Sequence, residues 1–226
     1  MIRVPAKVIR SRQMPSANTI AMPDASGRAA RTRRRIHDAA RQEFSRHGLA
    51  VQIDDIVRAA AISRGTFYNY FSTIEGLFEH VAAEMARDMG ERIHARLADN
   101  DDPAVRVSQG IRHFCMRAHE ERDWGQFLTH FALSTELLQT AIRETALLDI
   151  QCGIAAGRFA LNADQAESAL ALMSGATLAA MKLILSGVET PLRAGQNVAE
   201  LTLRAFGIAP AEATALARAD LIPLRN

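Results

Sequence analysis

The sequence has few cysteines, few aromatic side chains and no runs of alternating β-branched residues. Its 226 residues include two cysteines, Cys115 and Cys152, and 5% aromatic residues. Two distant cysteines cannot build the disulfide framework of a small secreted domain. Alternating strand patterns are missing, whereas the abundant Ala, Leu and Arg favour helices. With 48% hydrophobic residues for a core, the composition predicts an all-α globular protein.

Signals for secretion or membrane insertion are also missing. The first fifteen residues lack the apolar centre of a signal peptide. The most apolar stretch, residues 168–188, contains Lys182 and is flanked by Glu167 and Glu189. A membrane span requires about 20 predominantly apolar residues without a central charge. We therefore expect a buried helix here and a cytoplasmic protein with no membrane partner.

Catalytic and metal-binding motifs are lacking as well. The chain contains no nucleophile elbow, phosphate-cradling glycine loop, paired zinc histidines or dinucleotide fingerprint. His113, Cys115 and His119 are close in sequence, but on a helix His113 and Cys115 point about 200° apart and cannot hold one ion together. We expect no metal site, no cofactor and no enzymatic activity, although a helical enzyme without a motif stays an alternative.

Charge is distributed unevenly along the chain. The first 35 residues carry nine basic residues and one acid, a net charge of +8, and the remaining residues carry 18 basic and 24 acidic residues, a net charge of −6. A basic end on an acidic protein indicates a polyanionic partner at that end. A solvated tail without a specific partner is the alternative.

Hydrophobic periodicity divides the rest of the chain into helices. Residues 1–28 are rich in Pro, Ser and Arg and are predicted to form a flexible basic arm. Residues 29–75 are predicted to form a helix-turn-helix DNA-binding domain, and residues 76–226 a domain for effector binding and dimerisation. The predicted helices span residues 31–47, 53–60, 64–70, 74–98, 103–121, 124–133, 135–158, 164–188, 191–206 and 210–219.

Two short helices behind a longer first helix have the pattern of a helix-turn-helix. Ser63 can cap the second short helix, and Phe67 is expected to point into the core. A groove-reading helix presents small and polar residues to DNA. The residues expected to contact DNA, including two arginines of the first helix, are Arg33, Arg34, Ser63, Arg64, Gly65, Thr66, Tyr68, Asn69 and Tyr70.

These segments resemble the tetracycline-repressor family of bacterial regulators. The resemblance rests on the runs 35–40, 53–57 and above all 62–71, Ile-Ser-Arg-Gly-Thr-Phe-Tyr-Asn-Tyr-Phe. It is strong over residues 31–80. It implies that Arg64, Gly65 and Tyr68 face bases, that Thr66, Asn69 and Tyr70 face phosphates, and that the protein is a ligand-responsive repressor that binds a palindromic operator as a homodimer.

The sequence departs from the family pattern at two positions. Ile74 stands where members usually carry a phosphate-binding lysine, and Gln52 stands where Thr or Ser usually caps the second helix. We therefore expect a missing phosphate contact and an irregular start to that helix.

The second half has a local concentration of aromatic residues at helical spacing. They can line an apolar pocket with a few polar groups, as small-molecule sites do, and ordinary core packing is the alternative for each. The residues expected at the effector site are Phe114, Cys115, Trp124, Phe127, His130 and Phe131. The expected effector is apolar or aromatic.

Residues 164–188 are apolar on nearly every side, and such a helix must be covered. Because groove-binding proteins of this kind need paired half-sites, we expect a dimer interface here. Burial within one subunit is the alternative. The residues expected at the interface are Leu172, Gly175, Leu178, Ala179, Leu183 and Leu201. A DNA-binding architectural protein without an effector is the remaining functional alternative.

Overall fold

A computed structural model describes residues 25–98, 100–131 and 136–224 of the chain, and every regular element in these ranges is a helix. The predicted arm lies mainly outside these ranges, and its last four residues belong to the first helix. The α-helices are α1 (Ala25–His47), α2 (Ile53–Ala59), α3 (Arg64–Tyr68), α4 (Ile74–Leu97), α5 (Pro103–Glu120), α6 (Arg122–Phe131), α7 (Glu136–Ala155), α8 (Ala166–Leu185), α9 (Pro191–Ala205) and α10 (Pro210–Arg218). Two 3-10 turns, η1 (Gly48–Ala50) and η2 (Ala163–Gln165), complete the set.

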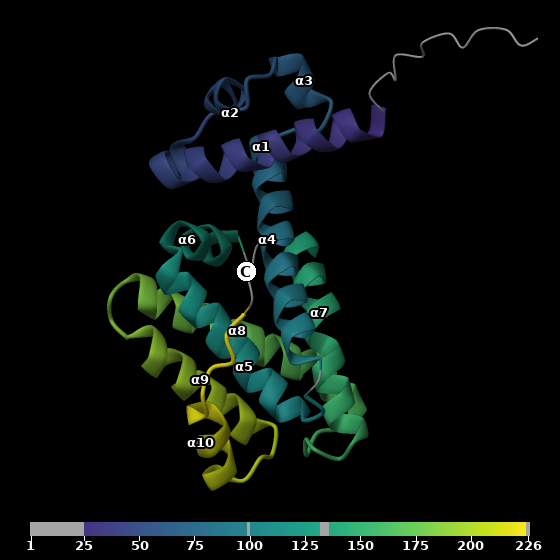
Figure 1. The fold of residues 1–226 in the computed structure, drawn as a ribbon, viewed down its shortest axis with the longest axis vertical. Coiled ribbons are helices and arrows are strands. Elements are labelled where there is room, and N and C mark those ends of the chain that lie inside the picture. The colour runs from purple at the N-terminus through teal and green to yellow at the C-terminus, as the bar shows by residue number, and fades with distance from the viewer. Residues whose placement is uncertain (1–24, 99, 132–135, 225–226) are drawn as a thin grey trace, which may run out of the picture.

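The helices form two bodies joined by α4. Helices α1, α2 and α3 form the small body at the top of Figure 1, and α4 runs from it into the larger body. There α4 packs along α7, α5 packs against both α8 and α9, and α10 closes the far end. The predicted boundary at residue 75 therefore falls inside one continuous helix, so that a tilt of α4 moves both bodies.

Capping side chains explain where several helices begin. Thr73 Oγ1 accepts a hydrogen bond from Gly76 N at 3.0 Å at the start of α4, and Asp102 Oδ1 accepts one from Ala104 N at 2.9 Å at the start of α5. Each oxygen satisfies an N–H group that has no partner inside its helix. At α2, Gln52 occupies the capping position, and its own N–H donates to Asp55 Oδ2 at 3.0 Å. The expected irregular start is therefore wrong: α2 begins at Ile53, and a capping box joins Gln52 and Asp55 at its first turn.

An aromatic cluster fastens the two bodies together. Phe127 of α6 lies 4.6 Å from Phe44 of α1 and 5.6 Å from Phe78 of α4 between ring centroids, and 5.0 Å from Phe131. All four rings are buried. Edge-on and tilted ring pairs of this kind stabilise a core beyond the area that they bury, so the cluster makes α6 a fixed support for α1.

Candidate DNA-binding surface and ligand cavity

The reading helix α3 is short and held at both ends. Ser63 Oγ accepts a hydrogen bond from Thr66 N at 3.0 Å and lies 2.9 Å from Thr66 Oγ1. Phe67 is fully buried and anchors the helix, as the sequence predicts. With that ring turned inward, the opposite side of α3 is left free to face a DNA groove.

The residues expected to contact DNA lie mostly on that free side. Tyr68 is 53% exposed, the largest exposed aromatic side chain in the described residues. Thr66 and Tyr70 are half-buried, and Tyr70 packs against the core. The exposed members of the predicted set are Arg33, Arg34, Ser63, Arg64, Gly65, Tyr68 and Asn69. Seven of the nine residues that the sequence assigns to DNA binding are therefore exposed to solvent.

Arg64 has a partner that the sequence analysis missed. Its Nε donates to Asp54 Oδ1 and its Nη2 to Asp54 Oδ2, both at 2.6 Å. The hydrogen bond from Arg64 lowers the pKa of Asp54, and the same bond raises the pKa of Arg64. Asp54 lies ten positions earlier on α2, and no periodic signal connects the two residues.

Arg35 was also missed, and it stabilises the turn between α2 and α3. Its Nη2 donates to Ala60 O and, at 2.7 Å, to Ala61 O. These carbonyls stand at the end of α2, where helical partners run out. Ala61 has φ +48°, and Ile62 N donates back to Val57 O at 3.0 Å. This is a Schellman ending whose left-handed position is filled by alanine instead of the usual glycine.

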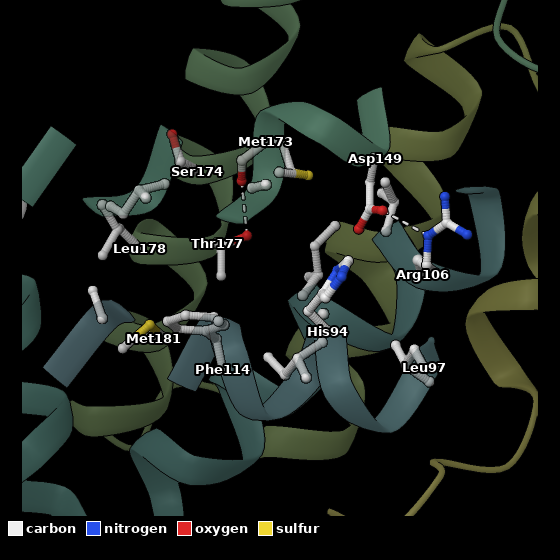
Figure 2. Close-up of a pocket in the computed structure, with 18 of the residues that line it drawn as sticks. His94, Leu97, Arg106, Phe114, Asp149, Met173, Ser174, Thr177, Leu178 and Met181 are labelled. Atoms are coloured by element: carbon white, nitrogen blue, oxygen red, sulfur yellow. Dashed lines mark hydrogen bonds and ion pairs between the residues drawn. The ribbon is translucent and has the colours of Figure 1, made fainter. Parts of the chain in front are cut away.

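A cavity of about 100 Å³ lies in the larger body, lined by residues of α4, α5, α6, α7 and α8. Figure 2 shows Phe114 at one wall, with Ser174 and Thr177 on one side and His94 and Asp149 on the other. Most of the lining is apolar, and the remaining members include Ile93, Leu97, Val107, Ile111, Leu128, Met173, Leu178 and Met181. Apolar walls with a few converging polar groups are typical of small-molecule sites.

Hydrogen bonds within the protein determine whether polar groups of the cavity can donate or accept a hydrogen bond to a ligand. Ser174 Oγ donates to Leu170 O at 2.8 Å and Thr177 Oγ1 donates to Met173 O at 2.7 Å, so each hydroxyl has used its proton and can only accept. Asp149 Oδ1 accepts from Arg106 Nε at 2.6 Å, and a carboxylate is again an acceptor. Ser174, Thr177 and Asp149 can therefore accept hydrogen bonds from a ligand in the cavity.

Of the six residues expected at the effector site, the structure places only Phe114 on this cavity. Trp124, Phe127 and Phe131 belong to the buried contacts between α6, α1 and α4, and Trp124 and Phe127 also border a separate polar hollow beside α1. Cys115 packs with residues of α8 and α9, and His130 is exposed. Aromatic clustering thus marked the junction of the two bodies, because rings fill a large core volume whether or not a ligand is near.

Comparison with known proteins agrees with this geometry. The family model described as tetracyclin repressor-like, C-terminal domain, matches residues 102–219, and that of bacterial regulatory proteins, tetR family, matches residues 36–81. The chain belongs to the tetracycline-repressor family. This is a family of DNA-binding transcriptional regulators, not of enzymes, and its members are soluble proteins that bind operators and small-molecule effectors and dimerise.

The chain is similar to other regulators in sequence and to several proteins whose structures have been solved. An uncharacterized HTH-type transcriptional regulator of Mycobacterium tuberculosis is 35% identical over 78 residues, 34% of this chain, and the match spans 39% of that relative's length. The crystal structure of RolR in complex with resorcinol is 28% identical, with a TM-score of 0.72, and covers 88% of this chain and 100% of RolR. SmeT, the repressor of a Stenotrophomonas maltophilia multidrug efflux pump, shares the fold at 20% identity, with a TM-score of 0.61 over 78% of this chain and 92% of its own.

The residues expected at the dimer interface divide into two groups. Leu172, Leu183 and Leu201 are 51%, 44% and 62% exposed, and Ala179 is exposed beside them. Gly175 is half-buried, and a Cβ added there meets open space. Leu178 is 7% exposed and lines the cavity instead. Its assignment to the interface is not supported, because α8 turns this side chain toward its own subunit.

Two further features bear on the predicted absences. The described residues contain no group of three or more His, Cys, Asp or Glu side chains that could hold a metal ion. One segment, Ala163–Leu185, is long and apolar enough to pass a composition test for a membrane span. In the fold its helix α8 packs against α5, α6, α7 and α9.

Proposed function

We propose that this chain is a cytoplasmic, dimeric repressor that releases its operator when a small molecule with hydrogen-bond donors occupies the cavity. The observation that carries the proposal is the path of α4. The helix begins at Ile74, directly after the reading head, and five of its residues, including His94 and Leu97, line the cavity. A ligand that wedges α4 changes the separation of the two reading helices, and half-sites tolerate little change from a spacing of about 34–36 Å.

The expected effector is a small aromatic ring with hydroxyl groups. Phe114 and the apolar walls suit a flat ring, and the acceptors at Asp149, Ser174 and Thr177 suit hydroxyl donors on opposite sides of it. RolR, one of the structural relatives, was solved with resorcinol, a dihydroxybenzene. To act, such a ligand must bind the DNA-free conformation more tightly than the DNA-bound one.

A second copy of the chain is the proposed partner of α8 and α9. On α8, Leu172 and Leu183 are exposed and lie on the same face of the helix, and on α9 Leu201 is exposed. Exposed apolar patches of this kind mark interaction sites. A symmetric pair of these surfaces would form a four-helix interface and place two reading heads on one operator.

The cavity is tested by filling it. Gly110 lines the cavity on α5, and nothing lies within 4 Å of a Cβ added there. We expect Gly110→Leu to occupy the space and weaken resorcinol binding, and the matched control Gly110→Ala to keep it. Operator duplexes are first selected from a random library with the full-length protein, and release by resorcinol and by other phenols is then measured.

Asp149→Asn tests the polar end, since an amide keeps the shape but loses the charge that holds Arg106. We expect weaker response to hydroxylated rings and unchanged operator affinity without ligand. Tight operator binding by every variant, with no phenol causing release at any concentration, would reject the effector and leave the DNA-binding function standing.

A further inference from the structure

Asp54 and Arg64 form a two-pronged ion pair on the surface expected to face DNA. Asp54 lies in the first turn of α2, and Arg64 is the first residue of α3. Nε and Nη2 of the guanidinium donate in parallel to the two carboxylate oxygens, each at 2.6 Å. Both side chains are more than half exposed. An exposed ion pair of this kind contributes little to the stability of the fold.

The pair uses only one edge of the guanidinium. Arginine presents five N–H donors in a flat fork. The side edge, Nε and Nη2, faces Asp54, and Nη1 makes no hydrogen bond to the residues that the structure describes. The end edge, formed by Nη1 and the second N–H of Nη2, remains open. Guanine offers two acceptors, O6 and N7, in the major groove at the spacing of this edge.

We infer that Asp54 is a positioning residue that holds Arg64 in the orientation for reading a guanine in each half-site. The inference rests on the proposed contact of α3 with DNA bases. An unrestrained arginine loses the freedom of several rotatable bonds when it binds. Arg64 has lost much of that freedom before it binds DNA, because its two hydrogen bonds to Asp54 fix the plane of the guanidinium group.

Asp54 also has an electrostatic consequence that separates specificity from affinity. A carboxylate near the phosphate backbone repels DNA of any sequence. The pair therefore improves the choice of base while it lowers binding to unrelated DNA. A carboxylate that acted only through this repulsion would lower binding to every DNA sequence equally and would not change the choice of base.

Asp55 provides a matched control on the same turn of α2. It carries the same charge and accepts no hydrogen bond from Arg64, since its oxygens accept from Gln52 N at 3.0 Å and from Arg58 Nη1 at 3.3 Å. Asp55→Asn removes one negative charge from this surface, while its remaining amide oxygen can still accept from Gln52 N at the start of α2.

The experiment compares base preference at each operator position for the full-length protein and its variants. Binding is selected from a random duplex library, and affinities are then measured for single-base substitutions and for an unrelated duplex. We expect Arg64→Ala to reduce the preference for guanine at one position per half-site by between roughly 5-fold and 150-fold. Asp54→Ala should reduce the preference at the same position by a smaller factor, with equal or tighter binding to the unrelated duplex.

Three results would overturn the inference. A guanine preference that Asp54→Ala leaves unchanged and Arg64→Ala removes would mean that the pair does not position Arg64. A stronger guanine preference in Asp54→Ala would mean that Asp54 withholds Arg64 from DNA. A uniform loss of affinity in Arg64→Ala would place Arg64 on a phosphate. In that last case, intact operator binding by the wild-type protein would still support the proposed function.

Two further measurements secure the interpretation. Asp54→Ala in an Arg64→Ala background should have no additional effect on base preference, because the residue acts only through Arg64. Asp55→Asn should keep the guanine preference and should match Asp54→Ala in its binding to the unrelated duplex. Circular dichroism at each stage confirms that the variants are folded.

Discussion

The ring of Phe114 lies against the indole of Trp124, with 5.8 Å between their centroids. Phe114 lines the cavity from α5, and Trp124 belongs to α6, which packs against α1 of the reading head. This contact joins the proposed effector site to the DNA-binding body by a route separate from α4.

Trp124 is the only tryptophan of the chain, so its fluorescence reports on this route. We expect resorcinol to change Trp124 emission in a saturable manner, because a ligand against Phe114 moves the ring that contacts the indole. Phe114→Leu should bind with a smaller change in emission. Saturable binding by calorimetry with unchanged emission would show that Phe114 does not transmit occupancy to α6.

Ala61→Gly should stabilise the protein by about 0.5–1 kcal/mol. An L-residue in the left-handed region is strained, and relief of that strain at φ +48° outweighs the greater freedom that glycine gains on unfolding. Ala59→Gly is the control, since Ala59 is exposed and helical on α2, and it should be destabilising by a similar amount. Denaturant unfolding measures both, and a loss of stability in Ala61→Gly would contradict the strain.

His113 should make the protein less stable in mild acid. Burial, opposed by a hydrogen bond to the Ile222 backbone and assisted by Arg112 and Arg92, lowers the pKa of His113 to about 4. The unfolded chain takes up a proton near pH 6.5 and the native chain does not, so the stabilisation is fully present above pH 6.5 and is lost as the pH falls toward 4, by at most about 3 kcal/mol.

Urea unfolding across this pH range measures the effect. His113→Gln should flatten the pH dependence, and the remaining slope should come from His37, whose pKa burial also lowers although Glu84 opposes it. An unchanged slope in His113→Gln would show that His113 titrates alike in both states.

The two cysteines should differ sharply toward thiol reagents. Burial raises the pKa of Cys115 to about 12, and the side chain is fully covered, whereas Cys152 is exposed. Because the thiolate is the reactive species, the native protein should incorporate one equivalent of iodoacetamide, at Cys152. Mass spectrometry of peptides locates the label, and rapid labelling of Cys115 in the native protein would show that α5, α8 and α9 open there.

Leu201→Glu should separate the subunits and leave each one folded. The side chain is 62% exposed on α9, so the change costs little within one subunit, but a carboxylate in a covered apolar interface has no partner. Leu148→Glu is the control, because Leu148 is similarly exposed but lies on α7. Sedimentation should show monomer for Leu201→Glu alone, and equal dissociation of both variants would place the interface elsewhere.

Local signals in the sequence determined the helices and the reading head. The spacing of apolar residues depends on helical geometry alone, and Ser63 and Phe67 act on residues within a few positions of themselves. For this reason the predicted helices agree with the structure apart from their ends, and Phe67 is buried as expected. The exposed surface of α3 follows from the same periodicity.

Only the tertiary structure decided where the cavity lies and what restrains Arg64. The cavity is lined by five helices whose crossings no local pattern encodes, and of the six residues that suggested an effector site only Phe114 reaches it. Arg64 meets Asp54 across the turn between two helices. Contacts of this kind depend on how helices pack against one another, whereas helix periodicity reports only which side of each helix is buried.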